Sequence, residues 1–181
     1  AAVGPCYFKA SSTRQLIAYL AKIAEVVPHL PFYYYHIPHL SGNNLDMIEF
    51  LQESAELIPS LKGIKYSALT VYEFQSCKEL FEGRYDVFFG CDEMLTSGLS
   101  AGADSAIGST YNLAGRLYRR IMESFAQGDI ETARKLQYLS VQMVRLCYTY
   151  RGLPAFKAVM KLLGLDCGPV RLPLHTLTNE E

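Results

Sequence analysis

The stretch Leu61-Lys62-Gly63-Ile64-Lys65-Tyr66-Ser67 is short, apolar in alternation, and enclosed by two segments with helical spacing. The segment before it, residues 45–58, ends at Pro59, and the segment after it, residues 71–81, ends at Gly83. A strand between two helices is the repeating unit of parallel α/β proteins, because parallel strands need a crossover connection. This order of helix, strand and helix therefore predicts an α/β fold.

The same alternation of strands and helices extends over the first two thirds of the chain. Besides residues 63–66, the segments predicted as strands are 1–5, 32–36, 87–90 and 105–108. A first helix, residues 15–27, starts at a Ser11/Ser12 cap and stops before Pro28, and another begins near 92–93 and ends by Gly102. Three helices then follow one another at 113–126, 130–150 and 153–163. No low-complexity linker interrupts the chain, so residues 1–181 are expected to form a single domain.

Composition excludes several classes of function. Half of the 181 residues are hydrophobic, 19% are charged, and the net charge is −1 without a basic stripe, which argues against nucleic-acid binding. No apolar run approaches the ~20 residues of a membrane span, and residues 1–5 lack the features of a signal peptide. The five cysteines are scattered and nowhere form a Cys-x-x-Cys pair. We therefore expect a cytoplasmic protein with neither disulfide framework nor metal site, and with no nucleic-acid or membrane partner.

Lys65 is the first candidate for chemistry, because it lies at the carboxyl end of a predicted strand between apolar neighbours. Burial there would disfavour the ammonium form and leave an amine able to attack a ketone. A surface lysine that extends from the strand end to solvent is the alternative interpretation.

Tyr35 ends the predicted strand 32–36 and precedes a loop that contains Pro38. Alternation puts Tyr33 and Tyr35 on one face of the strand and Tyr34 on the other. A phenol at this position could transfer a proton to and from a substrate hydroxyl, although an aromatic core residue would show the same pattern. His36 and His39 have no partner at metal-ligand spacing, so no metal site is predicted.

Four further candidates follow the later strands. Gly90, Asp92 and Glu93 come directly after the strand 87–90, and Ser109 follows the strand 105–108. The carboxylates could accept hydrogen bonds from a polyol, or they could stabilise a helix N-terminus. The carboxyl ends of parallel strands meet at one edge of a sheet, which is where barrel enzymes assemble their active sites.

Several motifs of the chain occur in the order and spacing of the N-acetylneuraminate lyase family. They are Tyr34-Tyr35-His36-Ile37-Pro38 with Ser41-Gly42, Gly63-Ile64-Lys65-Tyr66-Ser67, Gly90-Cys91-Asp92-Glu93, Ala101-Gly102-Ala103-Asp104, and Ile107-Gly108-Ser109-Thr110-Tyr111-Asn112. The match extends through the helical tail with Gly128-Asp129-Ile130, Arg151-Gly152-Leu153-Pro154 with Lys157, and Gly168-Pro169-Val170-Arg171-Leu172-Pro173-Leu174. The chain thus resembles the animal branch of this family, within the dihydrodipicolinate synthase superfamily, over essentially its whole length.

The resemblance implies a class I aldolase that cleaves sialic acid to pyruvate and N-acetylmannosamine. Lys65 would form the imine with the substrate, and Tyr35 would carry the proton of the C4 hydroxyl. Ser67, Gly90, Asp92, Glu93 and Ser109 match substrate-binding positions. The covalent lysine imine needs no metal or organic cofactor. The implied assembly is a homotetramer or other homo-oligomer.

The resemblance also implies a partial (β/α)8 TIM barrel, namely about the last five βα units followed by a C-terminal helical tail. The βα units would occupy residues 1–112, and the last barrel helix with the C-terminal helices would occupy residues 113–181. The family's preceding strands and its Gly-Ser/Thr-Thr-Gly-Glu carboxylate loop are not found in these 181 residues. We therefore expect weak or no activity from this polypeptide alone. Two alternatives stay open: a non-catalytic form that binds ligand or a full-length subunit, and an aldolase for another 2-keto-3-deoxy sugar acid.

Overall fold

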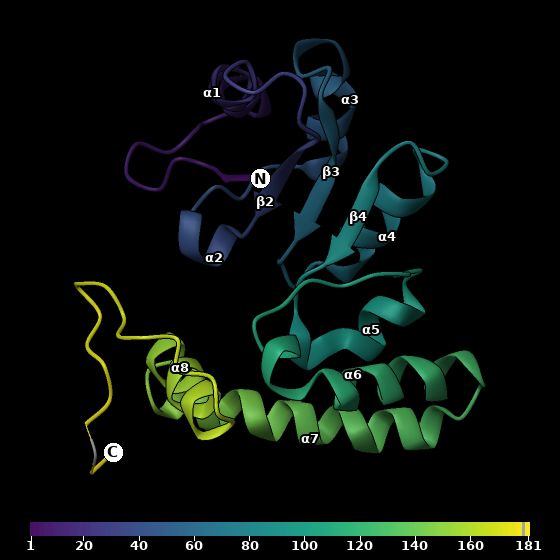
Figure 1. Cartoon of the computed structure of the whole chain (residues 1–181). Helices are drawn as coiled ribbons and strands as arrows, with labels where there is room; N and C mark the ends of the chain where they lie inside the picture. The colour runs from purple at the N-terminus through teal and green to yellow at the C-terminus, as the bar shows by residue number, and fades with distance from the viewer. Residues whose placement is uncertain (179) are drawn as a thin grey trace. The chain divides into compact units, whose positions relative to one another are not determined.

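A four-stranded parallel sheet forms the centre of the N-terminal half of the chain (Figure 1). The computed structural model describes residues 1–178 and 180–181. The strands follow one another in the sheet in chain order: β1 (Ala2–Val3), β2 (Phe32–His36), β3 (Leu61–Tyr66) and β4 (Asp86–Phe89). All three pairings are parallel, which confirms the sheet predicted from the alternation of strands and helices.

Helices connect these strands, and two of them begin at side-chain caps, those of Ser12 and Asp46. They are α1 (Thr13–Ala24), the single turn α2 (Pro38–Ser41), α3 (Met47–Leu57) and α4 (Val71–Glu79). The hydroxyl of Ser12 accepts a hydrogen bond from the Gln15 N–H at 3.3 Å, so the predicted cap of α1 is confirmed. The turn α2 was not predicted; proline at its first position and left-handed Gly42 at its end delimit it.

The two faces of the sheet have different surroundings. One face is apolar and packs on helices: the ring of Tyr34 lies 5.0 Å from that of Phe50 in α3, and Phe74 in α4 lies 5.1 Å from Phe89. On the opposite face the side chains of β2 are only half-buried, as the alternating burial of the strand shows. This open face carries Tyr35 and, across the register, Lys65.

The strand predicted at residues 105–108 is wrong as a strand, because only one bridge, between Phe89 and Ala106, forms there. The Phe89 N–H donates to the Ser105 carbonyl at 3.1 Å, and the Ile107 N–H donates to the Phe89 carbonyl at 2.9 Å. Gly108 follows this bridge, and its backbone packs so closely on Asp92 that a Cβ would lie 1.6 Å from the carboxylate.

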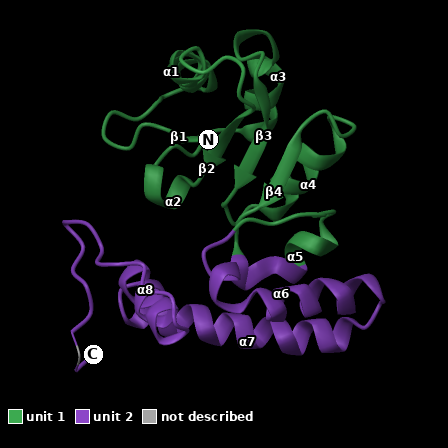
Figure 2. Cartoon of the chain, viewed as in Figure 1, with its two compact units in different colours: residues 1–91, 97–107 green, residues 92–96, 108–181 purple. Residues whose placement is uncertain are grey.

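The described residues form two compact units, shown in Figure 2. Unit 1 comprises residues 1–91 and 97–107, with the sheet and α1 to α4, and unit 2 comprises residues 92–96 and 108–181. The 3₁₀ turn η1 (Asp92–Met94) belongs to unit 2, and α5 (Leu95–Ser100) passes from unit 2 into unit 1. The single domain predicted for residues 1–181 stays a prediction.

Three long helices make up most of unit 2: α6 (Tyr111–Ala126), α7 (Ile130–Thr149) and α8 (Leu153–Leu162). Their existence was predicted, with ends that differ by one or two residues. Helix α6 packs along α7, and the residues buried in the two helices include Ile121 of α6 and Ala133 and Val144 of α7. Within the described residues, no helix has both the length and the apolar character that crossing a bilayer requires.

Candidate active site

Lys65 and Tyr35 lie side by side on the open face of the sheet. The two residues are register partners in neighbouring strands β3 and β2. The Lys65 Nζ lies 3.8 Å from the centroid of the Tyr35 ring, which is a cation–π distance. The structure thus brings together the predicted nucleophile and the predicted proton carrier.

The surroundings of Lys65 differ from the enclosed site that the sequence suggested, because the side chain is half-buried. Its neighbours across the register are Tyr35 on one side and Phe88 on the other. Lys62, the other lysine of the strand, is exposed at the opposite end of β3. Only Lys65 therefore combines a strand-end position with aromatic neighbours.

Ser67 and Gly90 adjoin each other at the carboxyl ends of β3 and β4. The buried Ser67 hydroxyl donates to the Gly90 carbonyl at 3.1 Å. A Cβ at position 90 would lie 2.0 Å from the Ser67 Oγ, so glycine is required for this approach. The hydroxyl proton of Ser67 is used within the protein, which leaves its oxygen lone pairs to interact with a ligand.

Asp92 is the centre of a buried polar network in unit 2. Its Oδ2 accepts hydrogen bonds from the Thr110 N–H at 2.9 Å and from the Thr110 hydroxyl at 2.5 Å. The Thr110 hydroxyl also contacts the Tyr118 hydroxyl at 2.5 Å, and Tyr118 contacts Ser140 at 2.9 Å. Gln137 donates to the Asp92 carbonyl at 3.1 Å. Asp92 is a predicted substrate-binding residue, and its Oδ2 atom connects the η1 turn to Thr110 at the start of α6.

Glu93 and Ser109 flank this network and are more accessible. Glu93 is half-buried and Ser109 is exposed, and both belong to unit 2 with Asp92. The predicted site residues thus form one group in unit 1, around Lys65, and one group in unit 2, around Asp92. Their assembly at a shared rim stays a prediction.

His36 and Tyr34 bury polar atoms on the helix-covered face of β2. Both ring nitrogens of His36 and the hydroxyl of Tyr34 are buried without a hydrogen-bond partner. Burial lowers the pKa of His36 to about 4 and raises the pKa of Tyr34 to about 12. His39 is exposed in α2. Among the described residues, no cluster of three or more His, Cys, Asp or Glu side chains could hold a metal ion.

Sequence reasoning missed two hydrogen-bonded pairs beside the candidate nucleophile. The Tyr66 hydroxyl donates to the Glu73 carboxylate on the covered face, and the Tyr33 hydroxyl donates to the Asp86 Oδ2 at 2.7 Å on the open face. The alternation of β3 indicates that Tyr66 points away from Lys65, but the partner of a buried tyrosine is set by tertiary packing. The Tyr33–Asp86 pair crosses β3 at Gly63, the register partner of both residues, where no side chain intervenes.

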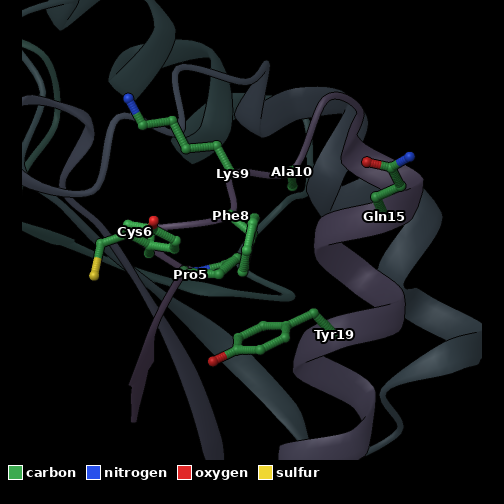
Figure 3. A pocket seen from close by; sticks show the side chains of 9 residues that line it. Pro5, Cys6, Phe8, Lys9, Ala10, Gln15 and Tyr19 are labelled. Carbon is green, nitrogen blue, oxygen red and sulfur yellow. The ribbon is translucent and has the colours of Figure 1, made fainter.

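A shallow hollow of about 560 Å³ lies between the β1–α1 loop and α1 (Figure 3). It is lined by Gly4, Pro5, Cys6, Tyr7, Phe8, Lys9, Ala10, Gln15 and Tyr19. None of these is a predicted site residue. The lining is mostly apolar and lacks a nucleophile paired with a base, so we do not place the chemistry there.

The fold and the candidate site define the class: a parallel α/β protein with a lysine and a tyrosine paired on adjacent strand ends, where the lysine amine could form an imine with a carbonyl substrate. The family model of the dihydrodipicolinate synthetase family matches residues 1–181, and the chain belongs to that family.

Sequence relatives and solved structures agree with this assignment. The chain is 37% identical over 176 residues to the N-acetylneuraminate lyase of Xenopus tropicalis, covering 96% of this chain and 57% of that protein. It superposes on the N-acetylneuraminate lyase of Proteus mirabilis with a TM-score of 0.93 and 42% identity, covering 98% of this chain and 60% of that one. A catalytic lysine mutant of the sialic acid aldolase of Ruminococcus gnavus gives a TM-score of 0.83 and 29% identity, with 98% and 58% covered.

The chain therefore spans a little under three fifths of the curated relative it matches. The solved structures of the family are (β/α)8 barrels, and the part matched here is an α/β parallel sheet with its helices. This confirms the predicted fold class, a partial TIM barrel with a helical tail.

Proposed function

We propose that the protein is a Schiff-base aldolase that cleaves N-acetylneuraminate to pyruvate and N-acetylmannosamine, with Lys65 as the nucleophile. The observation that carries the proposal is the pairing of the Lys65 amine with the Tyr35 ring at 3.8 Å, at register partners of adjacent parallel strands. The names of the relatives, and the catalytic lysine in the name of one solved structure, support it.

In the proposed reaction the Lys65 amine attacks the C2 ketone of the open-chain sugar acid, and water leaves to give a protonated imine. The C3–C4 bond then breaks, its electrons flow into the imine, and Tyr35 takes up the C4 hydroxyl proton while it passes its own phenolic proton on to the substrate carboxylate or to solvent. N-acetylmannosamine leaves as the aldehyde. The remaining enamine takes a proton at C3 and is hydrolysed to pyruvate and free lysine. Because the imine is the electron sink, the reaction needs no metal or organic cofactor.

The substrate-binding residues that the resemblance implied stay part of this proposal. Ser67 and Gly90 offer oxygen atoms next to the carboxyl end of β3. Glu93 and Ser109 are proposed to hydrogen-bond the hydroxyl groups of the sugar, since both are accessible. Asp92 is the weaker candidate, because Thr110 already occupies one of its oxygens.

This occupancy of Asp92 favours one second candidate, an aldolase for a less hydroxylated 2-keto-3-deoxy sugar acid. Incubating the protein with N-acetylneuraminate and, separately, with deoxy sugar acids distinguishes the two. Release of pyruvate and N-acetylmannosamine from N-acetylneuraminate at the higher kcat/KM supports the first proposal. Faster cleavage of a deoxy sugar acid would replace it with the second. No pyruvate from either substrate would contradict both and favour the non-catalytic form that binds ligand or a full-length subunit.

The setting of the enzyme is also proposed. The scattered cysteines of the sequence support a reducing compartment such as the cytoplasm. The strongly exposed rings of Tyr7 and Phe8 support association with further copies or with a longer subunit of the same family. Light scattering of the purified protein at several concentrations tests the association; a monomer at all of them would contradict it.

A further inference from the structure

Tyr66 and Glu73, on the face of the sheet opposite Lys65, form a hydrogen-bonded link that ties the end of β3 to two helices. We propose that this Tyr66–Glu73 clasp positions the Lys65 amine for imine formation. The inference rests on the proposed function, because it concerns the same nucleophile. Tyr66 follows Lys65 directly and is fully buried, whereas Lys65 is half-buried on the open face.

The hydroxyl of Tyr66 is held at several points. It donates to the Glu73 Oε2, and it lies 2.9 Å from the Thr70 hydroxyl and 3.1 Å from the Thr70 carbonyl. Burial, followed by the hydrogen bond to Glu73, raises the pKa of Tyr66 well above its usual range, so the phenol keeps its proton. A phenylalanine would fill the same apolar space, which means that the hydroxyl serves the link and not the packing.

Glu73 extends the link from α4 to α3. Its Oε1 accepts the Met47 N–H at 2.9 Å, the first N–H of α3, which has no partner inside that helix. A carboxylate at a helix N-terminus is stabilised by the helix dipole, so the charge of Glu73 is favourable in this place. A single side chain therefore connects β3, α4 and α3.

The backbone on either side of Tyr66 is fixed within the sheet. The Tyr66 carbonyl accepts the Gly90 N–H, and the Ser67 N–H donates to the His36 carbonyl, each at 2.8 Å. These bonds fix the strand end within the plane of the sheet, and the Tyr66 side chain fixes it perpendicular to that plane.

The position of this strand end matters to chemistry because the lysine side chain is long and flexible. Its amine reaches a carbonyl carbon productively only if the backbone that carries it is held, and a displacement of about 1 Å can reduce a rate about 100-fold. The clasp fixes this backbone from the face of the sheet opposite Lys65.

The matched pair Tyr66→Phe and Tyr85→Phe tests the proposal. Tyr85 is also buried in unit 1, and its hydroxyl donates to the Leu51 carbonyl at 3.0 Å, so each variant loses one buried hydroxyl. We expect similar losses in unfolding midpoint from both variants. Only Tyr66→Phe should lower, by about tenfold, the maximal rate at which pyruvate and borohydride label Lys65, with the half-saturating pyruvate concentration little changed.

Glu73→Gln provides a second route to the same answer, because glutamine can still accept the Met47 N–H while weakening the bond to Tyr66. It should slow labelling like Tyr66→Phe, and the double variant should be no slower than either single one. Equal rates in Tyr66→Phe and Tyr85→Phe, or additive losses in the double variant, would overturn the proposal.

A general amine reagent separates this inference from the proposed function. Labelling of Lys65 by acetic anhydride, measured by peptide mapping relative to Lys62, reports the surroundings of the amine without any imine. If pyruvate labels no lysine in the unmodified protein, the proposed function fails; the clasp then stands if Tyr66→Phe still changes the Lys65-to-Lys62 ratio and Tyr85→Phe does not. An unchanged ratio in both variants would overturn the clasp.

Discussion

The two faces of the sheet use neighbouring residues of the same strands for different purposes. On the open face, Tyr35 and Lys65 are half-buried and meet in one ring contact. On the covered face, Tyr34, His36 and Tyr66 are almost fully enclosed by helices α3 and α4. A one-residue step along the chain thus separates reactive groups from core groups, as the two-residue period of a strand requires.

The difference indicates what substitutions on each face should change. Residues of the open face have few contacts to lose, so their replacement should affect reactivity more than stability. Residues of the covered face should affect stability first. The Tyr66–Glu73 clasp is the proposed exception. It lies on the covered face, but it would fix the position of the strand end that carries Lys65.

The largest effect is expected from Tyr35→Phe. The ring stays, so the contact with Lys65 persists and the pyruvate adduct should still form. Cleavage of the sugar acid should fall by about 10²–10⁴-fold, because the phenol proton is lost. The free energy of unfolding should change by less than about 0.5 kcal/mol. Cleavage rates, borohydride labelling and urea unfolding measure the three quantities.

The control for this variant is Tyr33→Phe, which removes a hydroxyl from the same face two residues earlier. If both variants cleaved the sugar acid at the rate of the unmodified protein, Tyr35 would not be the proton carrier. The open face would then contribute Lys65 alone.

On the covered face, the buried imidazole of His36 should make the free energy of unfolding depend on pH. Its folded pKa of about 4 lies below the unfolded value of 6.5, so the unfolded state binds more protons between these values. The free energy of unfolding should be highest above pH 6.5 and should fall by about 3 kcal/mol as the pH drops to 4. The rings next to His36 belong to Tyr34 and Tyr66, whose hydroxyls do not ionise in this range.

Urea unfolding at a series of pH values measures this dependence. His36→Phe should flatten the curve between pH 6.5 and 4, and the control is His39→Phe, which removes an exposed imidazole. Equal slopes for the unmodified protein and His36→Phe would mean that another group causes the acid sensitivity.

The smallest effect is expected from removing the Tyr33–Asp86 hydrogen bond. Asp86 is exposed, and a bond of this kind contributes about 0.5 kcal/mol, so Tyr33→Phe should lower the free energy of unfolding by about that amount. The pyruvate adduct at Lys65 should form at an unchanged rate. A loss of labelling would contradict this expectation and show that the Tyr33 hydroxyl contributes to the surroundings of Lys65.

Much of the fold followed from local patterns in the sequence. Apolar spacing, the Ser12 cap and the proline and glycine stops located the helices, and strand β2 was predicted with its observed bounds, Phe32–His36. The segment 105–108 was wrong as a strand, because it forms a single bridge with Phe89, and the length of such a pairing depends on tertiary structure.

The candidate site shows the same limit. Lys65 and Tyr35 were predictable, since each ends a strand and strand ends of a parallel sheet share an edge. The hydrogen bonds between Asp92 and Thr110 were not predictable. Thr110 lies 18 residues away in the sequence, and it donates through both its backbone N–H and its hydroxyl. The Tyr66–Glu73 link likewise depends on how α4 packs on the sheet.

Borohydride trapping of the pyruvate adduct tests directly whether Lys65 is the Schiff-base amine. The protein is incubated with pyruvate, reduced with borohydride and mapped by peptide mass spectrometry, alongside the variants Lys65→Arg and Lys62→Arg. Arginine keeps the positive charge but is not a nucleophile at neutral pH. We predict an adduct on Lys65 that Lys65→Arg abolishes and Lys62→Arg preserves; an adduct on another lysine, or none in the unmodified protein, would contradict the assignment of Lys65.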